Sequence, residues 1–447
     1  MNLQDLKRRA QELIGSGKFR DARSLYEEIC RTDPGDAEAW FMLGAVHGRL
    51  GSLTEAISSN RRALELKQDY PEAHYNLARA LQETGEFAEA ERSYRETLKL
   101  KPGNPDACNN LGNVLRGLGR PREALEMFEK ALAINPEHPP ARCNRSLAWL
   151  LLGDFARGWP EFEWRWARSE HPPRRLPGPQ WDGADLHGKT LLVHAEQGYG
   201  DTIQFARYLP LLKQRGARIV CECQPPLTRL LRTMRDIDTV VTQGDTLPPF
   251  DLHVPLLSLP RIFASDATTI PARTPYLAVP DGNYTQIESV FATESDGYRI
   301  GFVWAGSPVH VNDRNRSCGL EHFRALSALD GIRLYSLQKG QCAEELKRNN
   351  FSARDLSVLL GDFADTAYAV TRLDLVITVD TSVAHLAGAL ARPVWTLLPF
   401  DPDWRWMLER QDSPWYPGMR LFRQPRPGDW DDVFRRVTAA LKQRTDA

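Results

Sequence analysis

The feature that most constrains how this chain can fold is a spacing of 34 residues that recurs from the N-terminus to about residue 165. Small residues return at this spacing in three columns. The columns are Ala39, Ala73, Ala107 and Ala141; Ala22, Ala56, Ala90 and Ala124; and Gly17, Gly51, Gly85, Gly119 and Gly153. Alanine columns let helices approach closely, and a glycine column lets the chain turn at the same place in every unit. The first third of the chain is therefore predicted to be a stack of helix pairs.

A column of mostly aromatic residues and two prolines complete the repeated unit. The column contains Tyr26, Asn60, Tyr94, Phe128 and Phe162, and the prolines are Pro102 and Pro136. This pattern resembles that of tetratricopeptide repeats, which stack into an α-solenoid. The resemblance implies that residues 1–170 form a groove that binds a peptide or another protein. Self-association and a role as a spacer are the alternatives.

Several asparagines fall near the inner-helix positions of such an array. They are Asn76, Asn109, Asn110, Asn113 and Asn144. Their side chains could hydrogen-bond the backbone of an extended peptide. Asparagine is also ordinary on a solvated helix face, so both interpretations stay open.

The balance of charge and the use of cysteine narrow the class of protein. In 447 residues, Lys and Arg number 57 and Asp and Glu number 58, so no basic excess predicts a nucleic-acid partner. The seven cysteines are scattered, which fits small core residues in a reducing compartment and not a disulfide framework. The sequence shows no signal-peptide core and no apolar run of about 18 residues. We therefore expect a soluble, cytoplasmic protein without an integral membrane segment.

A segment rich in tryptophan and proline follows Gly153 and predicts a last helix docked on the next domain, then an extended strap. Beyond it, strands and helices are expected to alternate, which predicts a parallel, doubly wound sheet. The expected strands are residues 190–195, 218–223, 239–242 and 252–255, and the expected helices are residues 202–213 and 227–234. The turn after the first strand contains Glu196, Gln197, Gly198 and Gly200, and Asp201 follows at a helix start.

A second series of strands and helices begins near residue 298 and predicts a second parallel sheet. Its expected strands are residues 299–304, 333–338, 375–379 and 394–398, and its expected helices are residues 320–329, 343–348, 365–372 and 432–442. Two such sheets imply a cleft, and ligands bind at the carboxyl ends of strands in sheets of this type.

The turn after residues 375–379 is the strongest candidate for an anion site. Asp380, Thr381 and Ser382 end a buried strand and open a helix that contains His385. The free amides and the positive end of a helix, with hydroxyl groups beside them, can hold a phosphate without a metal. The simpler alternative is that one of these side chains is only an N-cap. In the polar loop after residues 299–304, Arg314 and Arg316 could bind a diphosphate.

The two helix-start motifs, Gly200-Asp201 and Asp380-Thr381-Ser382 with His385, resemble those of the lipopolysaccharide heptosyltransferases. These are glycosyltransferases of the GT-B fold. Repeats ahead of such a region also resemble the protein O-linked N-acetylglucosamine transferases. The resemblance covers roughly residues 185–445. It implies an α-solenoid followed by two Rossmann-like parallel-sheet domains, an acceptor domain at residues 171–295 and a nucleotide-sugar domain at residues 296–447.

The resemblance also implies roles for single residues in the two helix-start motifs. Asp201 matches the aspartate assigned as general base in the heptosyltransferases. Asp380 and Thr381 match the helix start near the phosphates of the nucleotide sugar. The basic residue of that family is matched by Arg314 or Arg316, which do not align cleanly with it.

In the O-linked enzymes, a lysine close after a strand-end glutamine contacts the phosphates. Gln338 and Lys339 stand at such a strand end in this sequence, although they are adjacent to each other. The resemblance therefore implies that they also contact the nucleotide-sugar donor. Their spacing differs from that in the O-linked enzymes, so this match is less specific than that of the helix-start motifs.

Together these features predict an inverting, metal-independent glycosyltransferase that moves a sugar from a nucleotide-sugar donor to a protein or glycan acceptor recruited by the repeats. The donor is a substrate, and no cofactor or metal is expected. The acidic pairs Asp236/Asp238 and Asp401/Asp403 fit turns, with Pro402 fixing the second. The alternative is a non-catalytic repeat scaffold whose degenerate GT-B domain binds a sugar nucleotide and a partner protein.

Overall fold

A computed structural model of the protein describes residues 2–167, 174–292, 297–310 and 312–445. The chain divides into two compact units, Met1–Leu152 with Glu161–Pro172, and Gly153–Pro160 with Pro173–Ala447. The predicted boundaries at 170/171 and 295/296 lie outside the described residues, so they stay predictions.

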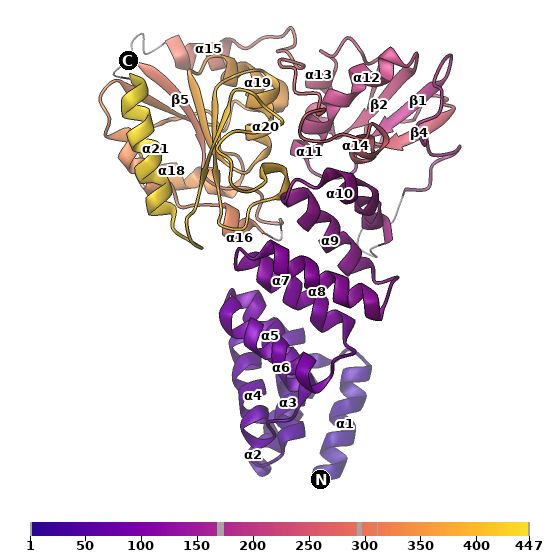
Figure 1. Ribbon diagram of the computed structural model, residues 1–447. Helices are drawn as coiled ribbons and strands as arrows, with labels where there is room; N and C mark the ends of the chain where they lie inside the picture. Colours follow the sequence, from indigo (N-terminus) through magenta and orange to yellow (C-terminus); the bar gives the residue numbers. More distant parts are fainter. Residues whose placement is uncertain (1, 168–173, 293–296, 311, 446–447) are drawn as a thin grey trace. The chain divides into compact units, whose positions relative to one another are not determined.

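The first unit is a series of paired helices (Figure 1). Among the described residues of this unit, nine helices are 13 or 14 residues long: α1 (Leu3–Gly15), α2 (Phe19–Thr32), α3 (Ala37–Arg49), α4 (Leu53–Leu66), α5 (Pro71–Thr84), α6 (Phe87–Leu100), α7 (Pro105–Gly117), α8 (Pro121–Ile134) and α9 (Pro139–Leu151). Helix α10 (Phe155–Phe162) is shared between the two units, and the 3-10 helix η1 (Glu163–Ala167) follows it. The predicted helix pairs are confirmed.

The repeated small residues have the roles that their spacing predicts. Every alanine of the two columns is at most 1% exposed. Every glycine of the third column has φ between 74° and 88°, a left-handed conformation that costs other residues free energy. Gly112 is a further position of the repeated unit where a small residue is needed, and it lies outside the three columns described above. A Cβ atom at Gly112 would overlap with the Phe128 ring, so the close contact of α7 with α8 requires glycine at this position.

The second unit contains a four-stranded parallel sheet with strand order β3-β2-β1-β4. The strands are β1 (Thr190–His194), β2 (Arg218–Cys223), β3 (Thr239–Thr242) and β4 (Leu252–Pro255). The helices are α11 (Tyr199–Phe205), α12 (Leu209–Gln214), α13 (Thr228–Leu231) and α14 (Leu259–Ile262), with 3-10 turns η2 (Ala206–Tyr208), η3 (Pro225–Leu227) and η4 (Leu256–Ser258). The helix expected at residues 202–213 is interrupted because Pro210 lacks the N–H that a continuous helix needs, and it starts α12 instead.

The second unit also contains a six-stranded parallel sheet with strand order β10-β9-β8-β5-β6-β7. Its strands are β5 (Tyr298–Val303), β6 (Ile332–Ser336), β7 (Arg354–Asp355), β8 (Leu375–Val379), β9 (Val394–Leu398) and β10 (Met419–Arg423). The sequence analysis missed β7 and β10. All residues of β8 and β9 are buried, as expected for strands covered on both faces.

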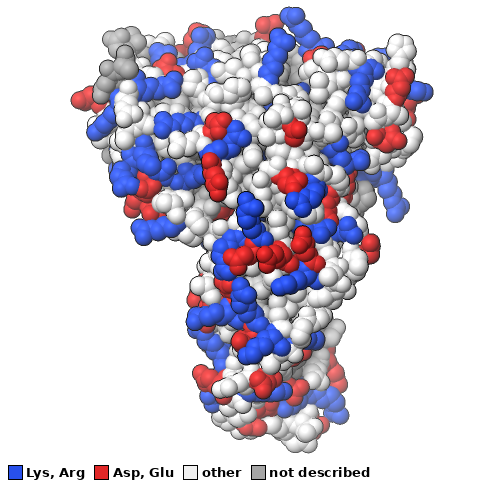
Figure 2. All heavy atoms as spheres, in the orientation of Figure 1, with Lys and Arg blue, Asp and Glu red and all other residues white. Residues whose placement is uncertain are grey.

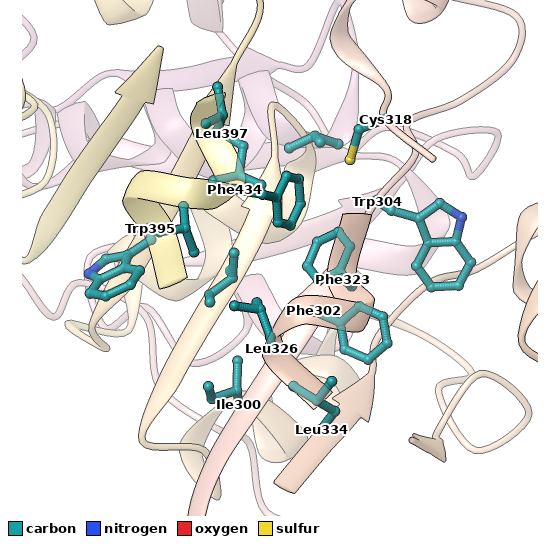
Figure 3. Close-up of a cluster of buried hydrophobic side chains, with 14 of the residues drawn as sticks. Ile300, Phe302, Trp304, Cys318, Phe323, Leu326, Leu334, Trp395, Leu397 and Phe434 are labelled. Atoms are coloured by element: carbon teal, nitrogen blue, oxygen red, sulfur yellow. The ribbon is translucent and has the colours of Figure 1, made fainter. Parts of the chain in front are cut away.

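Helices cover both faces of this sheet, with α21 on one face and α19 and α20 on the other (Figure 1). The helices are α15 (Thr285–Ala292), α16 (Asp313–Arg316), α17 (Arg324–Ser327), α18 (Glu345–Arg348), α19 (Phe363–Thr371), α20 (Ser382–Ala389) and α21 (Trp430–Thr445), with 3-10 turns η5 (Leu320–Phe323), η6 (Gln341–Glu344) and η7 (Trp404–Trp406). On the α21 face, the ring of Phe323 lies 4.9 Å from that of Phe302 and 4.8 Å from that of Phe434 (Figure 3). These rings belong to the hydrophobic core that packs α21 against the six-stranded sheet.

No helix among the described residues is long and apolar enough to cross a membrane. On the face that Figure 2 shows, acidic and basic side chains are interspersed and neither sign dominates.

We expect Gly112→Ala to destabilise the repeat unit by about 1–3 kcal/mol, because the added methyl group has no room beside Phe128. Gly48→Ala is the matched control. Gly48 is also helical, but a Cβ atom added there would meet no heavy atom within 4 Å among the described residues. The control should be neutral or up to about 1 kcal/mol stabilising. Urea unfolding followed by circular dichroism measures both, and equal effects would contradict the packing argument.

Candidate functional site

The predicted site loops lie at the topological switch points of the two sheets. In the four-stranded sheet the chain leaves β1 toward β2 and β3 and returns on the other side of β1 with β4. In the six-stranded sheet it leaves β5 toward β6 and β7 and returns beside β5 with β8. Ligands of open parallel sheets bind outside the carboxyl ends of the strands at such points. The loops after β1, β5 and β8 are these ends, and they contain most of the predicted site residues.

The starts of α11 and α20 contact each other, which brings the two helix-start motifs together. A Cβ atom at Gly200 would lie 2.9 Å from His385 Cδ2 and 3.5 Å from Ser382 Cα. Glycine at position 200 is therefore explained by the close approach of the second helix, not by a turn. This contact joins the carboxyl-end loops of both sheets into one site.

Asp201 lies at this junction, and both of its carboxylate oxygens have partners. Oδ2 accepts a hydrogen bond of 2.9 Å from the Gly198 N–H, so Asp201, in the first turn of α11, caps the start of this helix. Oδ1 is bound by the guanidinium of Arg405. The predicted position of Asp201 at a helix start is confirmed, and its role as a base stays a prediction.

Arg405 is a site residue that the sequence analysis missed. It lies in η7, beyond the carboxyl end of β9, and its side chain is 10% exposed. In addition to Asp201, its Nη1 donates to Asp403 Oδ1 at 2.8 Å and its Nε donates to Gln204 Oε1 at 2.7 Å. The turn predicted around Asp403 is present, since Asp403 Oδ1 also accepts from the Arg405 N–H at 3.0 Å. The sequence around Arg405 predicts only a turn, because its contact with Asp201 is formed by tertiary structure.

Thr381 is the N-cap of α20, but its side chain does not cap the helix. Its hydroxyl lies 2.9 Å from that of Thr378, and its carbonyl accepts from the Ala384 N–H at 3.0 Å. The first turn of α20 therefore starts without a side-chain cap. This arrangement does not match the alternative in which Thr381 acts only as a cap.

Burial raises the pKa of Asp380 to about 6, and the negative charge of Asp403 adds to the shift. Trp406 and the guanidinium groups of Arg316 and Arg405 act against it. Asp380 is therefore a carboxyl group whose charge changes close to neutral pH, directly before the start of α20.

The structure distinguishes Arg316 from Arg314. Arg316 Nη1 donates to the carbonyl oxygen of Asp380 at 3.2 Å, and its Nε lies 3.2 Å from Asp313 Oδ1. Its side chain is 15% exposed, whereas Arg314 is exposed on the loop. Of the two predicted arginines, Arg316 is the one that reaches the end of β8.

His385 is a buried, neutral imidazole. Burial and the charges of Arg405 and Arg207 lower its pKa well below the ordinary value. Its Nδ1 lies 3.0 Å from Tyr416 Oη, and its ring stacks on Trp406 at 5.3 Å between centroids. His385 therefore supports the junction by packing.

Gln338 and Lys339 brace the backbone. The side chain of Gln338 bonds to the N–H groups of Trp304 and Ala305 and to the carbonyls of Ala305 and Lys339, at 3.0–3.1 Å. The Lys339 ammonium group donates to two backbone carbonyls, at 2.7 and 2.6 Å. These contacts occupy the amide group of Gln338, whereas Lys339 is exposed and its ammonium group has a third N–H. Contact of either residue with the sugar-nucleotide donor stays a prediction.

Glu196 and Gln197 likewise tie strand ends together. Glu196 Oε1 accepts from the Leu257 N–H at 3.0 Å, which joins the ends of β1 and β4. The carbonyl of Gln197 accepts from Gln224 Nε2 at 2.8 Å, which joins the ends of β1 and β2. Both residues shape the loop that carries Asp201.

The α11 half and the α20 half of the second unit are fastened by Arg207, which is 2% exposed. Its guanidinium donates to the Trp415 carbonyl at 2.5 Å and lies 4.5 Å from the centre of the Tyr416 ring. Among the residues described, no cluster of three or more His, Cys, Asp or Glu side chains is arranged to hold a metal ion.

In the repeat unit, three of the predicted asparagines hydrogen-bond to one another. Asn144 Nδ2 donates to Asn109 Oδ1 at 2.8 Å, Asn109 Nδ2 donates to Asn110 Oδ1 at 3.1 Å, and Asn110 Nδ2 donates to Tyr75 Oη at 3.1 Å. This network runs across α9, α7 and α5. Peptide binding by these side chains stays a prediction.

The Asp380 pKa predicts a pH dependence of stability. Because its folded pKa of about 6 exceeds the ordinary 3.8, the folded state binds this proton more tightly than the unfolded state. The stabilisation is complete below about pH 4 and is lost as the pH rises through 6. Relative to Asp380→Asn, the wild type should gain about 1–1.5 kcal/mol between pH 7.5 and 5. Urea unfolding at both pH values measures the difference, and a constant difference would contradict the burial of Asp380.

Residues 29–142 match the family model of the cytochrome c-type biogenesis protein H TPR domain, and residues 3–46 match the tetratricopeptide repeat model. The N-terminal region therefore contains tetratricopeptide repeats, as predicted. Protein FlbA of Caulobacter vibrioides is 25% identical over 327 residues, which cover 67% of this chain and 54% of FlbA. The chain thus spans about half the length of this curated relative.

Solved structures with similarity to this chain include MamA, with 25% identity and a TM-score of 0.34 over 36% of this chain and 94% of that chain. Another is PilW, described as a widely conserved type IV pilus biogenesis factor, with 23% identity and a TM-score of 0.35 over 38% of this chain and 78% of that chain. The matches to the family models identify the repeats, and the similarity to FlbA extends over a larger share of the chain than its first unit.

Proposed function

We propose that this protein is an inverting, metal-independent glycosyltransferase with a GT-B arrangement, which transfers a sugar from a nucleotide-sugar donor to a hydroxyl group of a protein or glycan. One observation carries the proposal. Loops from the carboxyl ends of two parallel sheets meet where α11 contacts α20, and they bring Asp201, Arg405, Asp380 and Arg316 into one charged cluster. Two sheets that contribute opposite sides of one site suit a reaction between two substrates.

The chemistry assigns a side of the cluster to each substrate. An acceptor hydroxyl must lose its proton as it attacks the anomeric carbon, and Asp201, in the first half, is the carboxylate placed to take that proton. The departing nucleoside diphosphate gains negative charge. The uncapped start of α20 and the guanidinium of Arg316 can stabilise that charge. A single direct displacement inverts the anomeric centre.

The repeats are proposed to recruit the acceptor. Every residue of the charged cluster lies beyond residue 190, so the donor site needs no residue of the first unit. The groove of a tetratricopeptide array suits an extended macromolecular ligand.

A second candidate function is a repeat scaffold that binds a sugar nucleotide without catalysis. The observation that favours it is the engagement of both Asp201 oxygens, since the Gly198 N–H and the Arg405 guanidinium compete with an acceptor hydroxyl for them. A transfer assay against a panel of nucleotide sugars, with hydrolysis of the donor as a second readout, separates the two functions. Binding without turnover would favour the scaffold.

We expect Arg316→Ala to weaken the binding of nucleoside diphosphate by about 10- to 100-fold, the cost of losing a charge-assisted hydrogen bond. Arg314→Ala is the matched control from the same loop, and it should bind as the wild type does because Arg314 is exposed. Isothermal titration calorimetry measures both affinities. Equal affinities for the two variants would place the phosphate away from the end of β8.

We expect Asp201→Asn to keep the fold and to lower turnover by about 10²- to 10⁴-fold, the usual effect of removing a general base. The amide oxygen can still accept from the Gly198 N–H, so the helix start is retained. Initial rates with saturating donor measure the effect, and thermal unfolding checks the fold. A folded variant with wild-type turnover would exclude Asp201 as the base.

A further inference from the structure

Arg405 holds the proposed base, although it belongs to the opposite half of the site. Its guanidinium reaches from η7 to two residues of α11, Asp201 and Gln204, and it is anchored on its own side by Asp403. Its side chain is 10% exposed, so these contacts lie in a largely water-excluded position. Breaking such a pair leaves an uncompensated charge on the arginine unless another anion takes the place of the carboxylate.

The pairing with Arg405 has a chemical consequence for Asp201. The guanidinium occupies Oδ1, so it competes with the hydroxyl group of an acceptor for that oxygen. Arg405 also lies close enough to Asp380, before the start of α20, for the two charges to interact. The same guanidinium therefore contacts the proposed base and interacts with the charge that precedes the proposed diphosphate position.

We propose that Arg405 is a positioning residue whose guanidinium moves from Asp201 to the diphosphate of the bound sugar nucleotide. Binding of the donor thereby frees Asp201 to act as the base. This inference rests on the proposed function. The bonds from Nη1 to Asp403 and from Nε to Gln204 can persist as an anchor while the Nη2 contact with Asp201 is exchanged for a phosphate oxygen.

The exchange fits the balance of the transfer step. The acceptor oxygen forms a bond to the anomeric carbon, and its proton moves to the released Oδ1 of Asp201. The bond from the anomeric carbon to the diphosphate breaks, and its electron pair stays on the diphosphate oxygen, whose added charge Arg405 then faces. If an acceptor binds first, Asp201 is still paired with Arg405 and cannot take its proton. We therefore expect the donor to bind before the acceptor.

The other charged groups of the cluster have their contacts within the second half of the site. Arg316 pairs with Asp313 and with the carbonyl of Asp380, which both belong to the α20 half. Asp403 stays with Arg405 in both states. Arg405 is thus the cation that links the donor site to Asp201. When a diphosphate binds, the pairing of Asp201 with Arg405 changes.

The test is a double-mutant cycle on ligand affinity, measured by isothermal titration calorimetry with the full chain. The probes are UDP, GDP, CDP, ADP and inorganic pyrophosphate. Asp201→Asn releases Arg405, so it should bind the preferred probe about 3- to 30-fold more tightly than the wild type does. Arg405→Gln should bind it about 10- to 100-fold more weakly. In the Arg405→Gln background, adding Asp201→Asn should change the affinity less than about 2-fold.

Arg426→Gln is the matched control, since Arg426 is 80% exposed and pairs with Asp429 away from the cluster. It should bind each probe as the wild type does. If Arg405→Gln does not fold, the same cycle is measured with Arg405→Lys, which keeps the charge but loses the fork of donors. In the Arg405→Lys background, the gain in probe affinity from Asp201→Asn should be at least about 3-fold smaller than in the wild-type background.

The outcomes separate this inference from the function on which it rests. If the wild type binds no probe at millimolar concentration, the proposed function fails and the transfer of Arg405 fails with it. If the wild type binds but Asp201→Asn brings no gain, only the transfer is overturned. An equal gain with and without Arg405 would show that removing a negative charge acts directly on the ligand, and it would also overturn the transfer.

Discussion

The close approach of the starts of α11 and α20 is the contact on which the proposed site depends. It is possible because Gly200 has no side chain at the place where the His385 ring lies. His385 is in turn held by Tyr416 and stacked on Trp406, next to the segment that carries Arg405. A bulkier residue at position 200 would move apart the two loops that supply Asp201 and Arg405. One glycine thus connects packing in the core to the geometry of the charges.

The charged cluster combines groups that would each be costly alone. Burial opposes the ionisation of both Arg405 and Asp380, and it raises the pKa of Asp380. For Arg405 the neighbouring carboxylates outweigh burial and raise the pKa. Asp201 and Asp403 compensate the charge of Arg405, while Arg316 lies against the carbonyl of Asp380. Structural ion-pair networks also perturb pKa values, so the position of this one at the switch points of two parallel sheets is what favours a functional role.

Local signals made the fold predictable. The 34-residue spacing repeats the same packing in each helix pair, and continuous apolar runs such as β8 mark strands covered on both faces. The helix starts at Asp201 and Thr381 were predictable because capping and turn chemistry is encoded within a few residues. Helix 202–213 was predicted as one piece, and Pro210 explains its interruption.

The partners within the site were not predictable, because they are set by tertiary contacts. Arg405 and Asp201 are about 200 residues apart in sequence, and nothing near Arg405 distinguishes it from a solvated arginine in a turn. Gln338 and Lys339 show the same limit, since their place at a strand end does not reveal that their side chains bond to backbone groups.

The central claim is that the start of α20 and the arginines around it hold the diphosphate of a sugar nucleotide. A crystal structure of the full chain with a bound nucleoside diphosphate tests it most directly. The account predicts phosphate oxygens within hydrogen-bonding distance of the Ser382 and Val383 amides and of Arg316. Diphosphate density at another place in the protein, with the start of α20 empty, would contradict it.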